Sequence, residues 1–347
     1  MKKTIVLILV LLMAFSVVAC DKATTETATT TAPATKTEAS GDGKTITLAN
    51  GTQYPNGTVT IIAPFSAGGS VDLGIRLFAK YAANYTNATI VVENITGGSG
   101  LTGIQTGLTR NADGYTMWHI DDGPQYITTD VSSCPFDVMK DMVPIGQMVA
   151  DDRVFAISPN ETRFTTGEEM LQYAKDHPGE LTVSTSGSGT IASLIVNYME
   201  ALTGAQFNII AYNGSSEAKA AFLGGHVDVM SAGVSEVANL VADGTGKVIL
   251  EFAETPVYAG AQSIIALGYK DAVLLSTNRG LAINAKCDPA IIDYWSDIMT
   301  KVCTNEEYLK EAASMNLVIR HRTSSEFLEQ MKVDFATWET IKRAAGL

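Results

Sequence analysis

The chain has 347 residues, with 24 Lys and Arg against 37 Asp and Glu, and its formal net charge is −13 at pH 7. Such acidity, without any run of basic residues, argues against nucleic acid as a partner. It leaves a small anionic ligand open, because net charge is screened beyond roughly 8 to 10 Å and the amides of a pocket act at closer range. About 300 ordered residues suffice for two domains of ordinary size.

The N-terminus has the features of an export signal. Lys2 and Lys3 precede an apolar run, Ile5–Leu12, in a segment too short to serve as a permanent membrane span. The segment ends in Val17-Val18-Ala19-Cys20, which resembles the bacterial lipobox, where the cysteine takes a diacylglyceryl group. Residues 1–19 are therefore predicted to be a lipoprotein signal peptide, with Cys20 lipidated. The alternative is that Cys20 is an ordinary residue near a soluble-export cleavage site.

A polar segment follows the signal. Asp21–Asp42 is almost wholly Thr, Ala, Lys, Glu and Ser, and has too little apolar surface to offset the entropy of folding. Residues 20–43 are therefore predicted to be a flexible tether that joins the lipid to a folded domain. This would place the protein outside the cytoplasm, in the periplasm or on the outer face of the cytoplasmic membrane.

The remaining cysteines and the histidines do not indicate a metal site. Cys287 and Cys303 flank one predicted helix and are either bridged in an oxidising compartment or buried as small apolar residues, whereas Cys134 has no evident partner. The sequence contains no CxxC or HExxH motif. We expect neither a metal nor a cofactor. The histidines occur singly, at His119, His177, His226 and His321.

From Thr58 onward, short apolar runs alternate with longer helix-like stretches, and the junctions are rich in Gly, Ser, Thr and Asn. This alternation predicts an α/β fold with mainly parallel sheets flanked by helices. The predicted strands are 59–63, 89–92, 115–120, 181–184, 207–210 and 227–230. The predicted helices are 71–83, one ending near Thr109, 190–202, 215–223, 235–241, 288–302, 306–314 and 324–345.

Two segments are predicted to cross between two lobes. Val143–Ser158 is mostly apolar but is interrupted by Asp151-Asp152-Arg153, and Gly280–Asn284 is a short apolar stretch before the closing helices. Lobe one is placed at 44–147 plus 284–347, and lobe two at 148–283. Two crossings predict a hinge, at Val149–Asp152 and near Leu281, and a cleft suited to closing on a ligand.

The loops after the strands are predicted to bind that ligand. In an open parallel sheet such a loop reaches the carboxyl edge, and the next helix offers unpaired N–H groups that hold an anion. Pro64–Asp72 contains Gly68-Gly69, which allow close approach of the backbone, and Ser70, which either caps the helix or bonds a ligand oxygen. Asp72 is as consistent with a helix cap as with a ligand contact. The pattern recurs at 94–103, 184–190, 212–215 and 226–228.

Across nearly all of the chain after about residue 54, these motifs resemble the substrate-binding component of tripartite tricarboxylate transporters, the TctC or Bug family. The resemblance implies a two-lobed periplasmic-binding fold whose first two loops hold a ligand carboxylate, partly through water, while lobe two reads the far end. It also implies delivery of a small carboxylated ligand to a two-subunit integral membrane permease. The matching stretches are 63–72 with Arg76, 92–103, 113–116, 181–189, 212–218 and 223–228.

Some positions depart from the family pattern, so ligand specificity is not carried over from any relative. Thr96 and Gly98 stand where a proline and an alanine are usual, Ser99 stands where glycine is usual, and Asn213 stands where lysine or arginine is frequent. The carboxylate grip is expected to survive these changes. The expected ligand-binding residues are Phe65, Ala67, Gly68, Gly69, Ser70, Asp72, Gly98, Ser99, Gly100, Thr102, Ser186, Ser188, Gly189, Thr190, Tyr212 and Asp228.

Two alternatives to transport remain. Gly98–Gly103 satisfies GxGxxG between a strand and a helix, which is typical of a dinucleotide-binding enzyme, but the motif follows the second strand rather than the first. The second alternative is a binding protein whose closed lobes are sensed by a signalling receptor. Because the sequence has no GxSxG elbow and no histidine in the context of a catalytic base, we do not expect an enzyme.

Overall fold

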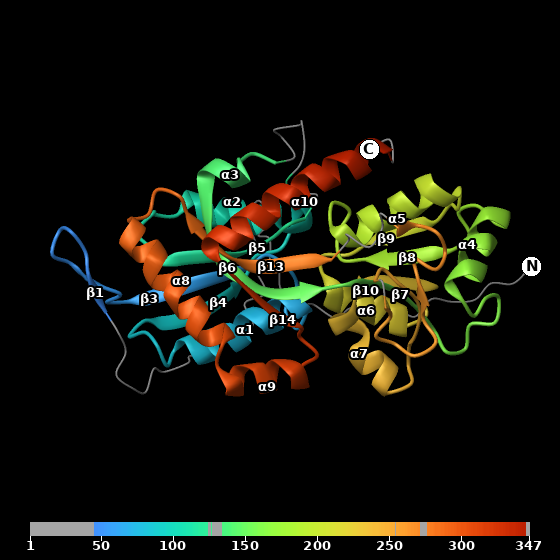
Figure 1. Cartoon of the computed structure of the whole chain (residues 1–347), viewed down its shortest axis with the longest axis horizontal. Helices are drawn as coiled ribbons and strands as arrows, with labels where there is room; N and C mark the ends of the chain where they lie inside the picture. The colour runs from blue at the N-terminus through green and yellow to red at the C-terminus, as the bar shows by residue number, and fades with distance from the viewer. Residues whose placement is uncertain (1–44, 124–125, 127–133, 254, 271–275, 345–347) are drawn as a thin grey trace, which may run out of the picture. The chain divides into compact units, whose positions relative to one another are not determined.

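The computed structural model describes residues 45–123, 126, 134–253, 255–270 and 276–344. The predicted signal peptide, the lipidation site Cys20 and the tether lie outside the described residues. Two six-stranded sheets, each with its own helices, form two lobes (Figure 1). The arrangement confirms the predicted α/β fold with two lobes.

The first sheet joins strands from both ends of the described chain. Its strands, in spatial order, are β14 (Ile319–Thr323), β6 (Met142–Asp151), β13 (Thr277–Asn284), β5 (Thr116–Asp121), β3 (Thr58–Ala63) and β4 (Thr89–Asn94). The helices of this lobe are α1 (Ser70–Ala82), the short 3₁₀ turn η1 (Gly98–Gly100), α2 (Leu101–Thr109), α3 (Val138–Asp141), α8 (Pro289–Cys303), α9 (Glu306–Ser314) and α10 (Ser324–Ala344). A small ribbon of β1 (Ile46–Thr47) and β2 (Gln53–Tyr54) precedes them.

The second sheet lies entirely between the two crossings. Its strands, in spatial order, are β12 (Gln262–Ser263), β11 (Lys247–Glu251), β7 (Arg153–Ile157), β10 (Val229–Gly233), β8 (Thr182–Thr185) and β9 (Asn208–Ala211). The helices of this lobe are α4 (Gly167–Asp176), α5 (Ile191–Thr203), α6 (Ser215–Leu223) and α7 (Val234–Ala242).

Both sheets contain parallel and antiparallel pairs, and in the second sheet β8 pairs parallel with β9 and β10, and β11 with β12. In the first sheet β3 pairs parallel with β4 and β5, but β13 pairs antiparallel with β5 and β6, and β14 pairs antiparallel with β6. In the second sheet β7 pairs antiparallel with both β10 and β11. Four of these antiparallel pairs involve β7 or β13, strands next to the crossings that lie inside the sheets and run against their neighbours, and the fifth joins β14 to β6.

The two crossings differ in how closely their positions in the structure match the predicted segments. The first lies at Asp152, between β6 and β7, within the predicted segment. The second precedes Thr277, because all eight residues of β13 belong to the first lobe, whereas the predicted boundary was at 283/284. Thr277, Asn278 and Arg279 are polar and interrupt the apolar pattern, which hid the start of this strand.

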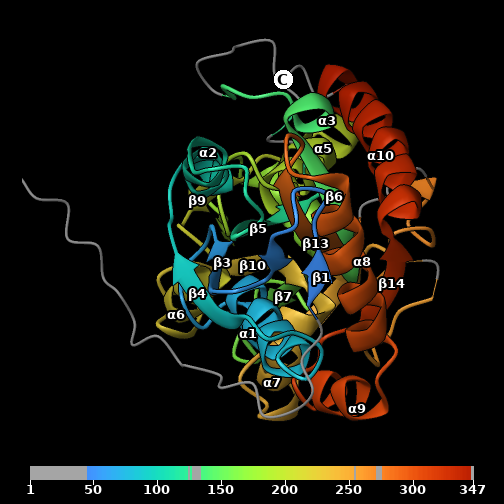
Figure 2. The same ribbon diagram turned by 90° about the vertical axis from the view of Figure 1, so that its left-hand side faces the viewer.

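Helix α10 makes a third link that the sequence did not predict. Phe327 and Met331 pack with Trp118 and Ala282 in the core of the first lobe. Trp338, two turns further on, belongs to the core cluster of the second lobe, and its Nε1 donates to the carbonyl of Asp122 over 2.6 Å. Figures 1 and 2 show α10 along one side of the first lobe, and Figure 1 shows it extending toward α5.

Helix α1 illustrates why these sequences fold as predicted. Ile75, Phe78 and Ala82 are three or four residues apart, share one face and are fully buried. Cys287 and Cys303, at the two ends of α8, are buried and free, as is Cys134. Of the two alternatives for Cys287 and Cys303, the structure therefore supports burial.

Candidate functional site

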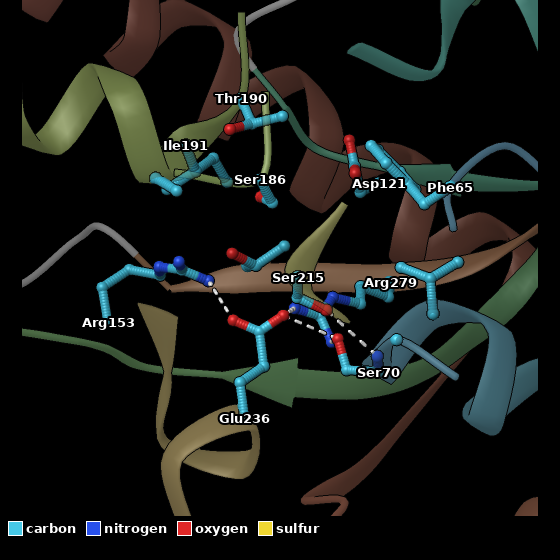
Figure 3. Close-up of a pocket in the computed structure, with 14 residues that line it drawn as sticks. Phe65, Ser70, Asp121, Arg153, Ser186, Thr190, Ile191, Ser215, Glu236 and Arg279 are labelled. Atoms are coloured by element: carbon cyan, nitrogen blue, oxygen red, sulfur yellow. Dashed lines mark hydrogen bonds and ion pairs between the residues drawn. The ribbon is translucent and has the colours of Figure 1, made fainter. Parts of the chain in front are cut away.

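A small pocket of about 40 Å³ is lined by residues from both lobes. The first lobe contributes the loop before α1 and the ends of β5 and β13, and the second contributes the starts of β7, α5, α6 and α7 (Figure 3). Five residues expected from the sequence line it, namely Phe65, Gly69, Ser70, Ser186 and Thr190.

Hydrogen bonds to Asp72 and Asn94 fix the conformation of the loop before α1, residues 64–69. The N–H of Gly68, at φ +76°, donates to Asp72 Oδ2 over 2.9 Å. The amide of Asn94 donates to Asp72 Oδ1 over 2.9 Å and to the Phe65 carbonyl over 3.1 Å. Asp72 is 2% exposed and pairs with Arg76, so it shapes the loop and does not line the pocket.

The loop before α5 is fixed in the same way. Gly187 accepts hydrogen bonds at its carbonyl from Thr190 Oγ1 over 2.8 Å and from Ser193 Oγ over 2.7 Å. Helix α5 then starts at Ile191, beside the pocket. Because α1 starts there as well, with the Ser70 N–H donating to Ser215 Oγ over 3.3 Å, two helix N-termini meet at this pocket, and their dipoles favour an anion.

The two lobes touch on both sides of the pocket. Ser66 Oγ and Ser216 Oγ are 2.6 Å apart, and Ser99 Oγ accepts the N–H of Gly189 over 3.0 Å. A Cβ atom at Gly214 would overlap Ser66. The structure is therefore a closed form, in which the lobes leave little space between them.

Three buried charged side chains, Arg153, Glu236 and Arg279, line the pocket (Figure 3), and buried Asp151 joins their cluster from outside the lining. Glu236 Oε1 accepts Ser70 Oγ over 2.7 Å and lies 3.6 Å from Arg279 Nη2, while Glu236 Oε2 accepts the Gly233 N–H over 2.7 Å. Arg279 Nη1 donates to Ser70 Oγ over 3.0 Å, and its Nη2 lies 3.3 Å from Asp151 Oδ2. Arg153 Nη1 lies 3.8 Å from Glu236 Oε2. Arginines from both lobes thus share one carboxylate.

These contacts set the protonation of the cluster. Burial alone would raise the pKa of Glu236, but Arg153, Arg279 and the Gly233 N–H outweigh it and lower that pKa to about 2. Burial raises the pKa of Asp151, against the opposing effect of Arg279. Glu236 is therefore ionised at neutral pH and balances charge on the arginines.

A second buried pair lies at the end of β5. Burial lowers the pKa of His119, so this imidazole is neutral near pH 7. Burial alone would raise the pKa of Asp121, but His119, the Gly123 N–H and Arg279 together lower it. Asp121 lines the pocket as an ionised group already engaged by the N–H of Gly123 over 2.8 Å.

The remaining predicted residues lie elsewhere. Ala67 and Gly68 are in the loop before α1 without lining the pocket. The second glycine loop packs against the first and against lobe two, since Ser99 bonds Gly189 and a Cβ atom at Gly100 would lie 3.1 Å from the Phe65 ring. Those outside the lining are Ala67, Gly68, Asp72, Gly98, Ser99, Gly100, Thr102, Ser188, Gly189, Tyr212 and Asp228.

Asp228 is tied into the second sheet. Its Oδ2 accepts the N–H of Thr182 over 2.9 Å and Thr182 Oγ1 over 2.6 Å, and its Oδ1 pairs with Arg163. It lines a separate surface hollow together with Arg163. Its role in this structure is to fix the start of β8 and the strand turn before β10.

Sequence reasoning missed most of the charged lining. Arg153 and Arg279 lie near the predicted crossings, but neither they nor Glu236 and Thr277 were among the expected ligand-binding residues. Glu236 occupies the third position of α7, where a glutamate commonly caps a helix, so its sequence context indicated nothing about a ligand. Asp121 directly follows the predicted strand 115–120 and was not among the expected ligand-binding residues.

Two kinds of feature are absent from the described residues. Within them, no group of three or more His, Cys, Asp or Glu side chains is placed to hold a metal ion. No helix in the described ranges is long and apolar enough to cross a membrane.

Comparisons with known proteins agree with this architecture. The "UPF0065 protein in gbd 5'region" of Cupriavidus necator is 26% identical over 297 residues, which cover 85% of this chain and 88% of that protein. Protein BugT of Bordetella pertussis is 29% identical over 177 residues, covering 50% of this chain and 54% of BugT.

Solved structures share the fold. The periplasmic binding protein BugD matches with a TM-score of 0.78 at 19% identity over 84% of this chain and 99% of BugD. Rpa4515 of R. palustris with adipate matches with a TM-score of 0.77 at 17% identity, over 84% of this chain and 98% of Rpa4515. MatC from Rhodopseudomonas palustris with bound malate matches with a TM-score of 0.76 at 17% identity, over 83% of this chain and 99% of MatC.

The family model described as "Tripartite tricarboxylate transporter family receptor" matches residues 75–347, well over half of the chain. It includes α1 from its sixth residue, the pocket residues of the second lobe and all three links between the lobes. The protein therefore belongs to the TctC family of solute-binding receptors.

Proposed function

We propose that this protein is a lipid-anchored, extracytoplasmic receptor that captures a small carboxylate between its lobes and delivers it to a tripartite tricarboxylate-type permease. The observation that carries the proposal is the closed pocket in which the N-termini of α1 and α5 meet two buried arginines. Each of these features favours an anion over a neutral ligand.

The acidic groups of the pocket do not contradict an anionic ligand. Glu236 is held by Ser70, Gly233 and both arginines, and Asp121 by Gly123. Their charges are thus already engaged within the protein. Two solved structures of similar fold contain adipate and malate, as their titles state, which supports a carboxylate as the ligand class.

The pocket volume restricts the size of the ligand. A cavity needs about 10 to 15 Å³ to hold one water molecule, so about 40 Å³ accommodates only a few water-sized groups in this closed form. A short carboxylic acid fits that space better than a dinucleotide, which weakens the enzyme alternative raised by the GxGxxG motif.

A thermal-shift screen of the full chain in mild detergent tests the ligand class. Short mono- and dicarboxylates should raise the melting temperature, because a ligand that binds only the folded state stabilises it by mass action. Amides of matched size, sugars and nicotinamide dinucleotides serve as controls. If only controls raise the melting temperature, the carboxylate proposal fails.

Anchoring and delivery rest on Cys20 and on the transporter named in the family description. Cys20→Ala should release the protein from the membrane fraction while leaving carboxylate binding intact. Uptake of the bound acid by intact cells should then fall. Unchanged uptake, together with a defect in a carboxylate-dependent transcriptional response, would instead favour the signalling-receptor alternative.

A further inference from the structure

One edge of a buried arginine in the pocket has no partner. Arg153, the first residue of β7, lines the pocket and is 3% exposed. Its Nη1 faces Glu236 at 3.8 Å, but its Nε and Nη2 have no hydrogen-bond partner and almost no solvent exposure. The guanidinium is therefore only half engaged by the protein.

The geometry of this edge matches a carboxylate. In the planar guanidinium, Nε–H and one Nη2–H lie on the same side and point in parallel, so that together they form a side-on fork for two oxygens of one group. Arg279, the other arginine of the pocket, differs, because its Nη1 bonds Ser70 and its Nη2 lies beside Asp151 and Glu236. Of the two arginines that line the pocket, Arg153 is therefore the one whose Nε and Nη2 are both available to form this fork.

A second unpartnered group lines the same pocket, on a residue that pairs in the sheet with Asp151, two positions before Arg153. Thr277, the first residue of β13, lines the pocket, is 6% exposed, and its Oγ1 has no hydrogen-bond partner. Buried donors left without a partner cost free energy, more so when charged. One carboxylate beside Arg153 and Thr277 would satisfy three such atoms at once.

The surrounding charges leave this fork free for a ligand. Glu236 can retain its contacts with Ser70 Oγ, the Gly233 N–H and Arg279 when a ligand binds Arg153. Asp151 is engaged by Ser235 and Arg279. The protein therefore does not need to break an existing ion pair in order to bind an anion there.

We propose that Arg153 binds a carboxylate of the ligand directly through its Nε and Nη2, with the Thr277 hydroxyl donating to the same group. This inference rests on the proposed function and deepens it by naming the residue that selects a charged group. Arg153 and Phe65 lie at opposite sides of the pocket (Figure 3). Arg153 is thus an anchor at a distance from the glycine loop before α1.

Titration calorimetry on the full chain tests the proposal, with succinate, malate and adipate and their monoamides as probes. Removing one partner of a desolvated charge pair commonly costs at least about 30-fold in affinity, so Arg153→Met should weaken the tightest-binding acid by that much. Arg153→Lys retains the charge without the fork and should lose about tenfold. Thr277→Val should lose about threefold to tenfold.

The matched control is Arg163→Met, which removes an arginine of the same lobe that pairs with Glu161 and Asp228 outside the pocket. Its affinity should stay within twofold of wild type. If the wild type binds none of the acids, the proposed function itself fails and Arg153 has no ligand role. If the wild type binds and Arg153→Met binds within threefold of it, the function stands and this inference is overturned.

A spectroscopic readout covers the case in which the methionine variant does not fold. The ¹H–¹⁵N spectrum of the wild type should contain an arginine Nε–H resonance that is absent from Arg153→Lys. Saturation with the tightest-binding acid should move that resonance, because a hydrogen bond to a carboxylate deshields the proton. A resonance unmoved at saturation contradicts direct binding.

Discussion

The two glycine-rich loops of the first lobe look alike in sequence but have different positions in the closed protein. The loop before α1 lines the pocket through Phe65 and Gly69, and Ser70 at the start of α1 bonds the buried carboxylate of Glu236. The loop at 97–100 contributes nothing to the lining, and Ser99 instead accepts a backbone N–H from Gly189 of the other lobe.

The difference comes from what the second lobe places opposite each loop. The first faces ion-paired side chains on α7 and β7, whereas the second faces a neutral backbone amide at the start of α5. Both loops thus bond the second lobe, through Ser66 and Ser99, but only the first of the two also lines the pocket. This difference depends on the partner surface, which local sequence does not describe.

The largest expected effect separates these roles at Gly69. A Cβ atom there would lie 3.0 Å from Ser215 Oγ and 3.2 Å from the Ser66 carbonyl, so Gly69→Leu should block closure and reduce carboxylate affinity at least about 100-fold. The backbone φ of −75° accepts a side chain, so the ligand-free melting temperature should change by only a few degrees. Calorimetry and thermal unfolding measure both.

Ala67→Leu is the control from the same loop. Ala67 is exposed and does not line the pocket, so its affinity should stay within threefold of wild type. Tight binding by Gly69→Leu would show that the loop before α1 is not part of the site.

The next effect concerns the charge that faces the first loop. Because the folded pKa of Glu236 is lowered to about 2, below its ordinary 4.5, its carboxylate stabilises the fold above pH 4.5 and loses that effect as the pH falls toward 2. Glu236→Gln should therefore cost about 3 kcal/mol at pH 7, and the difference from wild type should shrink below pH 4.5.

Thermal unfolding between pH 7 and 3 tests this dependence. Glu339→Gln, which breaks an exposed pair with Arg343 on α10, should cost less than about 0.5 kcal/mol. A penalty for Glu236→Gln that is the same at pH 7 and pH 3 would contradict the assigned pKa direction.

A smaller effect is expected at the second loop. Ser99→Ala removes one hydrogen bond between the lobes, worth about 1 kcal/mol, and should weaken carboxylate binding about fivefold by disfavouring closure. The rate of ligand release should rise by a similar factor, as measured by stopped-flow fluorescence. A loss as large as that of Gly69→Leu would mean that Ser99 touches the ligand, and the contrast between the loops would disappear.

The smallest effect on binding is expected at Asp228, which the sequence nominated as a ligand contact. Asp228→Asn weakens the bonds to Thr182 and the pair with Arg163, so it should cost about 1 kcal/mol of stability and leave affinity within twofold. Chemical denaturation and calorimetry measure these separately. A tenfold loss of affinity would instead indicate that Asp228 contacts the ligand.

Local chemistry predicted much of the fold. Helix α6 has the predicted bounds of 215–223, and α1 is displaced by one residue, since apolar spacing and glycine turns are encoded within each segment. The loop before α1 was also identified, because its glycines and the helix that follows are adjacent in sequence. The start of β13 was missed because its first residues are polar.

The charged cluster at the pocket could not be predicted from the local sequence. Ser70 and Arg279, which share a hydrogen bond, are 209 residues apart, and Glu236, which contacts both, belongs to the other lobe. No spacing rule links such positions. Burial, which decides whether an arginine is a surface charge or a ligand group, also depends on the assembled fold.

Helix α10 has a consequence for how the two lobes can separate. It is fixed to the first lobe by Phe327 and Met331, while Trp338 inserts its ring into the second and bonds Asp122 of the first. Opening must therefore bend the helix between Met331 and Trp338 or withdraw one tryptophan from its socket. Helix α10 therefore restrains the relative motion of the two lobes in addition to the two crossings.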